Sequence, residues 1–227
     1  MTDPQYYNNA NPHLLAFMSR RHQHVLEIGC GMGALGEAFK KEYNPQCIYR
    51  GVEYEEDAAE QAAKRLDSVL CGDVEAMSNA DLGIEEGSLD CLIYGDVLEH
   101  LHDPWAELSR RSLLVKPRGA VLACIPNVGH WSMVTRLMMG DWDYADSGIL
   151  DRTHLRFFTR KSIYQLFEGA GLKITRIKGI TKEGNWSARF FDALDGPLRE
   201  LGMDAQAFRD QAANLQYALK AIRVPPE

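Results

Sequence analysis

The chain has 227 residues, of which 45% are hydrophobic and 25% charged, and its formal net charge is −7. This composition is typical of a globular protein with one full-sized core, and an acidic balance without a basic stripe argues against a nucleic-acid partner. Because the sequence has no run of about 18 apolar residues and no basic-then-apolar leader, we expect a cytoplasmic protein without a membrane partner.

The predicted elements begin with strands and helices that alternate along the first half of the chain. Short apolar runs closed by glycine or acidic residues are typical of buried parallel strands. They predict strands over four segments: 24–30, 47–54, 68–73 and 90–96. Helices are predicted over 34–43 and 59–66, where apolar residues recur at helical spacing. We expect the polar segment 75–88 to form one loose helix and a loop.

A further helix is predicted to open at Pro104, since proline is favoured at a first helical position. It is expected to end before the turn KPRG at 116–119. One face of the segment around it carries the following residues: Leu101, Trp105, Leu108, Ser112 and Val115.

The second half continues with a fifth strand, predicted over 120–127. Residues 130–158 are expected to be irregular and aromatic. Thr159 then caps a clear helix, and a sixth strand is predicted over 172–180. The tail is expected to hold one or two helices and a last strand over 217–224.

This order of elements predicts an α/β protein with a Rossmann-like, doubly wound, mostly parallel seven-stranded sheet. We interpret residues 1–227 as a single domain, with an N-terminal arm over 1–22 and a lid over 128–158, inserted after the fifth strand. Ligands of such sheets bind beyond the carboxyl ends of the strands, so a lid at this position would cover the ligand site.

The cysteines show no Cys-x-x-Cys spacing; they are Cys30, Cys47, Cys71, Cys91 and Cys124. We interpret them as small core residues in a reducing compartment rather than as metal ligands or disulfides.

The turn after the first strand, EIGCGMGAL at 27–35, is rich in glycine. Gly29 and Gly31 allow a tight turn and a close approach of the backbone to a ligand. The turn alone is ambiguous, because Gly29, Gly31 and Ala34 also satisfy a loose dinucleotide-binding fingerprint. A structural turn without a ligand is a third interpretation.

Four of the predicted strands end in a carboxylate at the same edge: Glu27, Glu53, Asp73 and Asp96. Such a row would repel a pyrophosphate and attract a ligand that carries a positive charge, ribose hydroxyls and an amine-bearing base. Glu53 could accept hydrogen bonds from both ribose hydroxyls, and Asp73 from an adenine amine. These acids argue against a nicotinamide-dependent oxidoreductase, which stays as the alternative.

Several motifs resemble those of class I S-adenosylmethionine-dependent methyltransferases, over about residues 20–180. They are VLEIGCGMG, GVEY, CGDVE and DCLIYGDVLEHLHDP, followed by LLVKPRGAVLACIPN. The similarity is greatest to bacterial small-molecule enzymes associated with sugar and natural-product pathways. It implies S-adenosylmethionine as cofactor and S-adenosylhomocysteine as product. The family's usual Pro-Gly-Gly is Pro117-Arg118-Gly119 here, on a predicted surface turn, which puts nothing catalytic in doubt.

The resemblance also implies which residues bind the cofactor. The glycine-loop backbone would hold the methionine part, Glu53 the ribose, and Tyr54 with Asp73 and Val74 the adenine. Residues 94–96 would line the sulfonium end. The full predicted set is Tyr7, Glu27, Gly29, Cys30, Gly31, Gly33, Glu53, Tyr54, Asp73, Val74, Tyr94, Gly95, Asp96 and His100. For Tyr7, ordinary packing of the N-terminal arm is an equal alternative.

The predicted lid is rich in aromatic residues and methionine, which suit a flat or sugar-like acceptor, although plain packing explains them equally well. The candidate substrate residues are Trp131, Trp142, Tyr144, Arg152 and Arg156. The two arginines could bind an acidic acceptor, but pairing with neighbouring aspartates is the favoured interpretation.

The segment LDRTHLRFF, residues 150–158, contains the first candidate base, His154. An oxygen acceptor must lose a proton during methyl transfer, and a histidine can take it near neutral pH. Asp151 could orient His154, or the two could only hold the lid shut. His130 is the second candidate base.

These observations favour O-methylation of a small molecule, with N-methylation next. A non-catalytic S-adenosylmethionine-binding module is a further alternative, and a homodimer is left open. No metal is expected, because His100, His102 and Asp103 lie at a predicted turn and a sulfonium needs no Lewis acid when a base is present.

Overall fold

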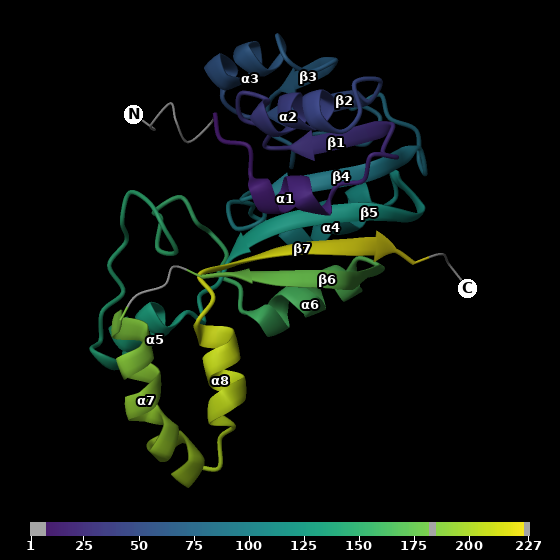
Figure 1. Ribbon diagram of the computed structural model, residues 1–227. Coiled ribbons are helices and arrows are strands. Elements are labelled where there is room, and N and C mark those ends of the chain that lie inside the picture. The colour runs from purple at the N-terminus through teal and green to yellow at the C-terminus, as the bar shows by residue number, and fades with distance from the viewer. Residues whose placement is uncertain (1–7, 182–184, 225–227) are drawn as a thin grey trace.

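The computed structural model describes residues 8–181 and 185–224, and a seven-stranded sheet forms its centre (Figure 1). The strands are β1 (His24–Ile28), β2 (Ile48–Glu53), β3 (Ser68–Cys71), β4 (Leu89–Gly95), β5 (Val115–Pro126), β6 (Leu172–Ile180) and β7 (Gln216–Arg223). They lie in the order β3-β2-β1-β4-β5-β7-β6, and β7 runs antiparallel to both of its neighbours. The predicted Rossmann-like, mostly parallel seven-stranded sheet is confirmed.

Helices cover both faces of this sheet. One face carries α1 (Pro12–Phe17), α2 (Ala34–Glu42) and α3 (Glu56–Ala62), and the other carries α4 (Pro104–Ser112) and α6 (Arg160–Gly169). Three further helices, α5 (Trp131–Met138), α7 (Asn185–Glu200) and α8 (Ala205–Ala212), stand away from the sheet at the lower left of Figure 1.

The central strands β1 and β4 are buried on both sides, as their apolar runs predict. Leu26 and Leu92 pair across the two strands and face the core beneath α4 and α6. Val25 and Ile93 face the opposite core, beneath α1 and α2. This alternation makes the sheet doubly wound and brings the carboxyl ends of β1, β2 and β4 to one edge.

The fifth strand begins earlier than the sequence predicts. α4 ends at Ser112, and β5 begins at Val115, which pairs with Leu89. Instead of ending a helix, the segment KPRG continues the strand, with a left-handed φ of 64° at Arg118.

Val115, predicted on one face of the helix, therefore lies in β5, where it is fully buried, and Trp105 of the same predicted face is 49% exposed. The helix begins after its capping residue Asp103 and buries five residues: Pro104, Glu107, Leu108, Arg111 and Ser112. The predicted face therefore shares Leu108 and Ser112 with the buried side of α4 but leaves out Glu107 and Arg111.

Two other local predictions differ from the structure. Residues 75–88 form turns and no helix, and the segment predicted to be irregular contains α5, for which His130 is the N-cap. Cys71 is exposed, whereas the other four cysteines are buried as expected. In the described part of the chain, no helix has both the length and the hydrophobicity that crossing a membrane requires.

Candidate functional site

The glycine loop between β1 and α2 is held against the end of β2 by its own backbone. The amides of Gly29 and Cys30 donate to the carbonyl of Val52, at 2.8 and 3.1 Å. Gly29, Gly31 and Gly33 have φ angles of 67°, 53° and 79°, in the region that glycine adopts without strain. A Cβ at Gly29 would also lie 2.4 Å from Cγ2 of Val97, so two independent constraints require glycine there.

Glu53, the predicted ribose ligand, is 5% exposed and already accepts three backbone hydrogen bonds. Its Oε2 accepts from the amide of Gly31 at 2.7 Å, and its Oε1 accepts from the amides of Tyr54 and Glu55 at 2.8 and 3.0 Å. A carboxylate offers about four lone-pair positions. Glu53 therefore braces the glycine loop and keeps limited capacity for a ligand hydroxyl, and its ribose contact stays a prediction.

Glu27 is buried beneath the loop rather than presented at the strand tip. The hydroxyl of Tyr49 donates to Glu27 Oε2 at 2.8 Å. Burial raises the pKa of Glu27 to about 8, the Tyr49 hydrogen bond opposes this, and the charge of Glu53 adds to it. The row of acids therefore holds less negative charge near neutral pH than the sequence suggests.

The residues predicted to bind adenine lie together beyond β2 and β3. Tyr54 is 70% exposed, Val74 is buried and Asp73 is exposed. Asp73 Oδ1 accepts from the amide of Glu75 at 2.9 Å, which fixes the turn after β3. An exposed ring, an apolar side chain and an acceptor in one place are the chemistry that an aminopurine requires.

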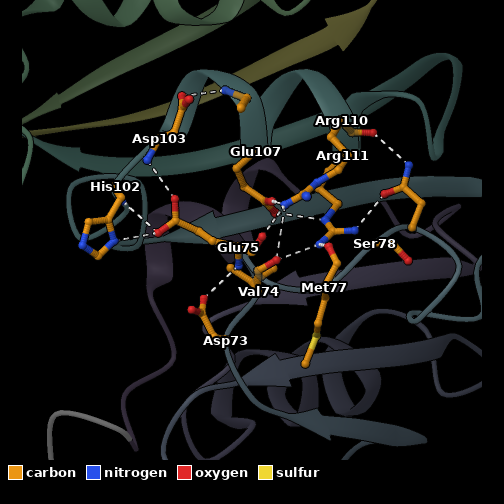
Figure 2. Close-up of polar contacts among 12 residues, drawn as sticks. Asp73, Val74, Glu75, Met77, Ser78, His102, Asp103, Glu107, Arg110 and Arg111 are labelled. Atoms are coloured by element: carbon orange, nitrogen blue, oxygen red, sulfur yellow. Dashed lines mark hydrogen bonds and ion pairs between the residues drawn. The ribbon is translucent and has the colours of Figure 1, made fainter.

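A buried network, missed by the sequence analysis, joins the turn after β3 to α4 (Figure 2). The guanidinium of Arg111 is fully buried; it donates from Nε to Glu107 Oε1 at 3.0 Å and from Nη2 to the carbonyls of Val74 and Met77 at 2.9 and 2.7 Å. These backbone contacts explain why the segment forms turns instead of the predicted helix. An acid and an arginine four residues apart, at 107 and 111, were the available signal.

A second contact in Figure 2 joins the same turn to the loop after β4. The carboxylate of Glu75 accepts from the amides of His102 and Asp103, both at 2.8 Å. The adenine side of the site and the loop that carries His100 are therefore fixed relative to each other.

The residues at the end of β4 are placed differently from one another. Tyr94 is fully buried, with its hydroxyl 3.4 Å from Glu107 Oε1, so any contact with the cofactor would have to come from its backbone. Gly95 leads to Asp96, which has a left-handed φ of 56°. Asp96 Oδ1 accepts from Nε2 of Gln216 on β7 at 2.8 Å, and burial raises the pKa of Asp96 to about 6.

The lid segment 150–158 lies directly against the loop after β4. The amides of Leu155 and Arg156 both donate to the carbonyl of Glu99, at 2.8 and 2.9 Å. This pairing brings His154 to His100, with ring centroids 4.7 Å apart in an edge-to-face arrangement. His100, which was predicted to lie on the cofactor side, therefore packs directly against His154, the first candidate base.

Glu99, His100 and His154 form one polar cluster. Each offers a ligand atom, and these three atoms all lie within 4.8 Å of one another. Glu99 is 2% exposed; its burial, then the charge of Asp96, raise its pKa well above the ordinary value. Burial also lowers the pKa of His100. We call this set the Glu99 cluster.

The other candidate substrate residues mostly contact the protein itself. Arg152 pairs with Asp146 at 2.6 Å, and both are exposed. Arg156 instead donates to the carbonyl of His102 and lies over the ring of Trp105, so the expected pairing with an aspartate is seen for Arg152 and not for Arg156.

The lid aromatics are divided between packing and exposure. Trp142 packs edge-on against Phe157, with centroids 5.3 Å apart, and Trp131 contacts Phe190 of α7. Tyr144 is 51% exposed. A role in acceptor binding stays a prediction for all three lid aromatics.

His130, the second candidate base, caps α5. Its Nδ1 lies 2.8 Å from Ser132 Oγ, and burial lowers its pKa to about 4. Tyr7 lies outside the described residues, so its predicted contact with the cofactor stays a prediction.

The sequence matches the family model described as a methyltransferase domain over residues 4–177. The chain belongs to this family. It is 28% identical over 205 residues to an uncharacterized 37.1 kDa protein in transposon TN4556 of Streptomyces fradiae, covering 88% of this chain and 52% of that protein. This chain therefore spans about half the length of that relative.

A second relative carries a biochemical name. The chain is 27% identical over 174 residues to the ubiquinone biosynthesis O-methyltransferase of Coxiella burnetii, covering 70% of this chain and 67% of the relative. Among solved structures, a SAM-dependent methyltransferase from Archaeoglobus fulgidus superposes with a TM-score of 0.65 at 16% identity, covering 97% of this chain and 95% of that one. The predicted family, class I S-adenosylmethionine-dependent methyltransferases, and its cofactor are confirmed.

Proposed function

We propose that this chain transfers the methyl group of S-adenosylmethionine to a hydroxyl of a small-molecule acceptor. The observation that carries the proposal is the Glu99 cluster, which places two histidines and a carboxyl group at the carboxyl edge of the sheet, beside Asp96. The name of the Coxiella relative, an O-methyltransferase, supports the same reaction type.

The residues at the edge fit the cofactor. The glycine loop leaves its left-handed backbone free of side chains, and Glu53 keeps one acceptor position beside it. Tyr54, Val74 and Asp73 supply an exposed ring, an apolar contact and an acceptor for the adenine. When bound, S-adenosylmethionine supplies an electrophilic methyl group on a positively charged sulfur.

The protein's own contribution is orientation, exclusion of water and removal of a proton. The lid is tied to the loop after β4 through the carbonyl of Glu99, so it can hold an acceptor over the edge. His154 is the group that we assign to the acceptor proton. Its Nδ1 lies 2.9 Å from the carbonyl of Ile149, an oxygen that can only accept, so Nε2 is left unprotonated.

The test is an assay of the full chain with S-adenosylmethionine and matched pairs of acceptors that differ only in hydroxyl against amine. We expect S-adenosylhomocysteine to form with the hydroxyl members, and mass spectrometry to place the methyl group on oxygen. Calorimetry with S-adenosylhomocysteine and with NADH serves as the cofactor control. Methylation of the amines alone would contradict the proposal, and binding of NADH alone would remove its basis.

A further inference from the structure

One oxygen of the Glu99 cluster lacks the partner that its burial requires. Glu99 Oε2 is buried and has no hydrogen-bond partner among the described residues. A buried carboxyl oxygen without a partner is unfavourable by about 1–3 kcal/mol, and more when it is charged. The buried Glu53 at the same edge, by contrast, accepts hydrogen bonds from three backbone amides.

Both histidines of the cluster are held from behind by backbone carbonyls. His154 Nδ1 lies 2.9 Å from the carbonyl of Ile149, and His100 Nδ1 lies 3.2 Å from the carbonyl of Thr153. A carbonyl can only accept, and the Thr153 hydroxyl, 3.1 Å from His100 Nδ1, donates to Asp151, so we assign the proton of each neutral ring to Nδ1 and the lone pair to Nε2. Within residues 8–181 and 185–224, neither Nε2 has a hydrogen bond to the protein.

This is the arrangement by which proteins prepare histidines for a metal. A ligating histidine donates its other ring N–H to a carbonyl or carboxylate, which fixes the tautomer and the ring direction. Here both rings are fixed in this way, and the three ligand atoms lie within 4.8 Å of one another. That spacing is slightly wider than ligands placed about 2.0–2.2 Å from one ion require, so small side-chain rotations would close it.

We propose that Glu99, His100 and His154 bind one divalent transition-metal ion, which activates the acceptor hydroxyl. The inference deepens the proposed function: the binding of the ion is independent of it, whereas the activation of the acceptor hydroxyl rests on it. It revises the sequence-based expectation that no metal is needed, and it changes how His154 acts: the nitrogen holds the cation rather than taking the proton itself.

The ligand types select the class of ion. Two imidazoles and one carboxylate suit Zn²⁺ or Fe²⁺, whereas Mg²⁺ and Ca²⁺ favour sites made of oxygen atoms. Three protein ligands also leave at least one position open, which is the mark of a catalytic rather than a structural site. Asp96 and Asp151 lie close enough to influence the pKa of Glu99, so their negative charges add to the attraction for a cation.

The open position would take the acceptor. A hydroxyl bound to a divalent cation loses its proton to water much nearer neutral pH, because the cation stabilises the oxyanion. The oxygen lone pair then forms the bond to the methyl carbon, the carbon–sulfur bond breaks, and its electron pair returns to sulfur. The products are the methyl ether and neutral S-adenosylhomocysteine.

The experiment titrates the chelator-treated full chain with Zn²⁺ by calorimetry, with Mg²⁺ as the comparison and Co²⁺ as an absorption probe of the ligand field. We expect one Zn²⁺ site. Glu99→Gln and His154→Ala should each lower the affinity for Zn²⁺. The loss should exceed the roughly 10–100-fold that follows when a metal ligand loses only its outer hydrogen-bond partner. His24→Ala, an exposed histidine at the start of β1, should bind Zn²⁺ like the parent chain.

S-adenosylhomocysteine binding, measured on every variant, shows whether each one is folded and separates the two proposals. Normal binding of S-adenosylhomocysteine without a Zn²⁺ site would overturn the metal inference and leave the proposed function standing. Zn²⁺ binding that survives in both Glu99→Gln and His154→Ala would also overturn it. A Zn²⁺ site without S-adenosylhomocysteine binding would instead contradict the proposed function, and full turnover after chelation would remove the ion from the reaction.

Discussion

Glu53 and Glu99 are both buried acids at the carboxyl edge of the same sheet, yet their surroundings are opposite. Glu53 accepts three backbone amides, whereas Oε2 of Glu99 has no partner among the described residues. On the cofactor side of the edge, the chain's own backbone therefore supplies most of the partners of the buried acid. On the acceptor side, the described residues leave a buried oxygen without one, which is the expected difference between a scaffold and a reacting centre.

The largest expected effect comes from removing the polar group at the centre of the acceptor side. His154→Ala should lower turnover about 10²- to 10⁴-fold, because the acceptor hydroxyl is no longer activated, whether His154 takes its proton or holds the cation that binds it. The affinity for S-adenosylhomocysteine, measured by calorimetry, should stay nearly unchanged. His130→Ala should produce the smaller loss of turnover, since its ring caps α5. Equal losses of turnover in the two variants would show that His154 has no special role on the acceptor side.

The next largest effect should fall on the scaffold and appear as lost stability. Arg111→Ala should lower the free energy of unfolding by about 3–5 kcal/mol, because it removes the fully buried arginine that pairs with Glu107 and donates to two backbone carbonyls. The matched variant Arg110→Ala removes the half-exposed arginine that pairs with the same acid, and should lower stability by at most about 1 kcal/mol. Urea denaturation of both variants provides the comparison.

A smaller effect is expected on cofactor affinity, and it distinguishes backbone strain from a steric clash in the glycine loop. Gly29→Ala places a Cβ against Val97, and should weaken S-adenosylhomocysteine binding on the order of tenfold or more. Gly87→Ala has a similar φ of 65° but open space around the added Cβ, so it carries the same strain, about 1–2 kcal/mol, without the clash. Its cofactor affinity should be that of the parent chain. Equal losses of affinity would show that strain alone explains both.

A gradual effect, spread over several pH units, concerns the buried acid beneath the glycine loop. The pKa of Glu27 is raised to about 8 in the folded chain, from an ordinary value of 4.5. The folded state therefore holds a proton that the unfolded state has lost between these values, and stability should fall as pH rises from about 4.5 to 8, by at most about 1.4 kcal/mol per pH unit. Glu27→Gln should remove this contribution. Parallel stability–pH curves for the variant and the parent chain would contradict it.

The scaffold was largely predictable from the sequence because its signals are local. Buried strands have two-residue alternation, and the glycine loop follows β1 directly, so neither depends on distant contacts. Tyr94 shows the limit of such reasoning. It lies two residues after Leu92 and faces the same core, so the parity of the strand could have shown that its side chain points away from the ligand.

The acceptor side could be predicted only residue by residue. His100 and His154 each stood out, but nothing in the 53 intervening residues specifies that the carbonyl of Glu99 accepts two amides of the lid. Such a contact depends on how loops close, and loops carry no periodic pattern. Arg111 was missed for a related reason, because a charged side chain on a helix is normally assigned to solvent.

The place of β7 in the sheet has a consequence for how the site is assembled during synthesis. β7 follows α8 in the chain but lies between β5 and β6, and its first residue, Gln216, donates to Asp96. As the chain emerges from the ribosome, β1 to β5 can pair in turn, whereas β6 has no strand to join until β7 has been made. The finished sheet, and with it the hydrogen bond that anchors Asp96, therefore forms only after residue 216 has emerged.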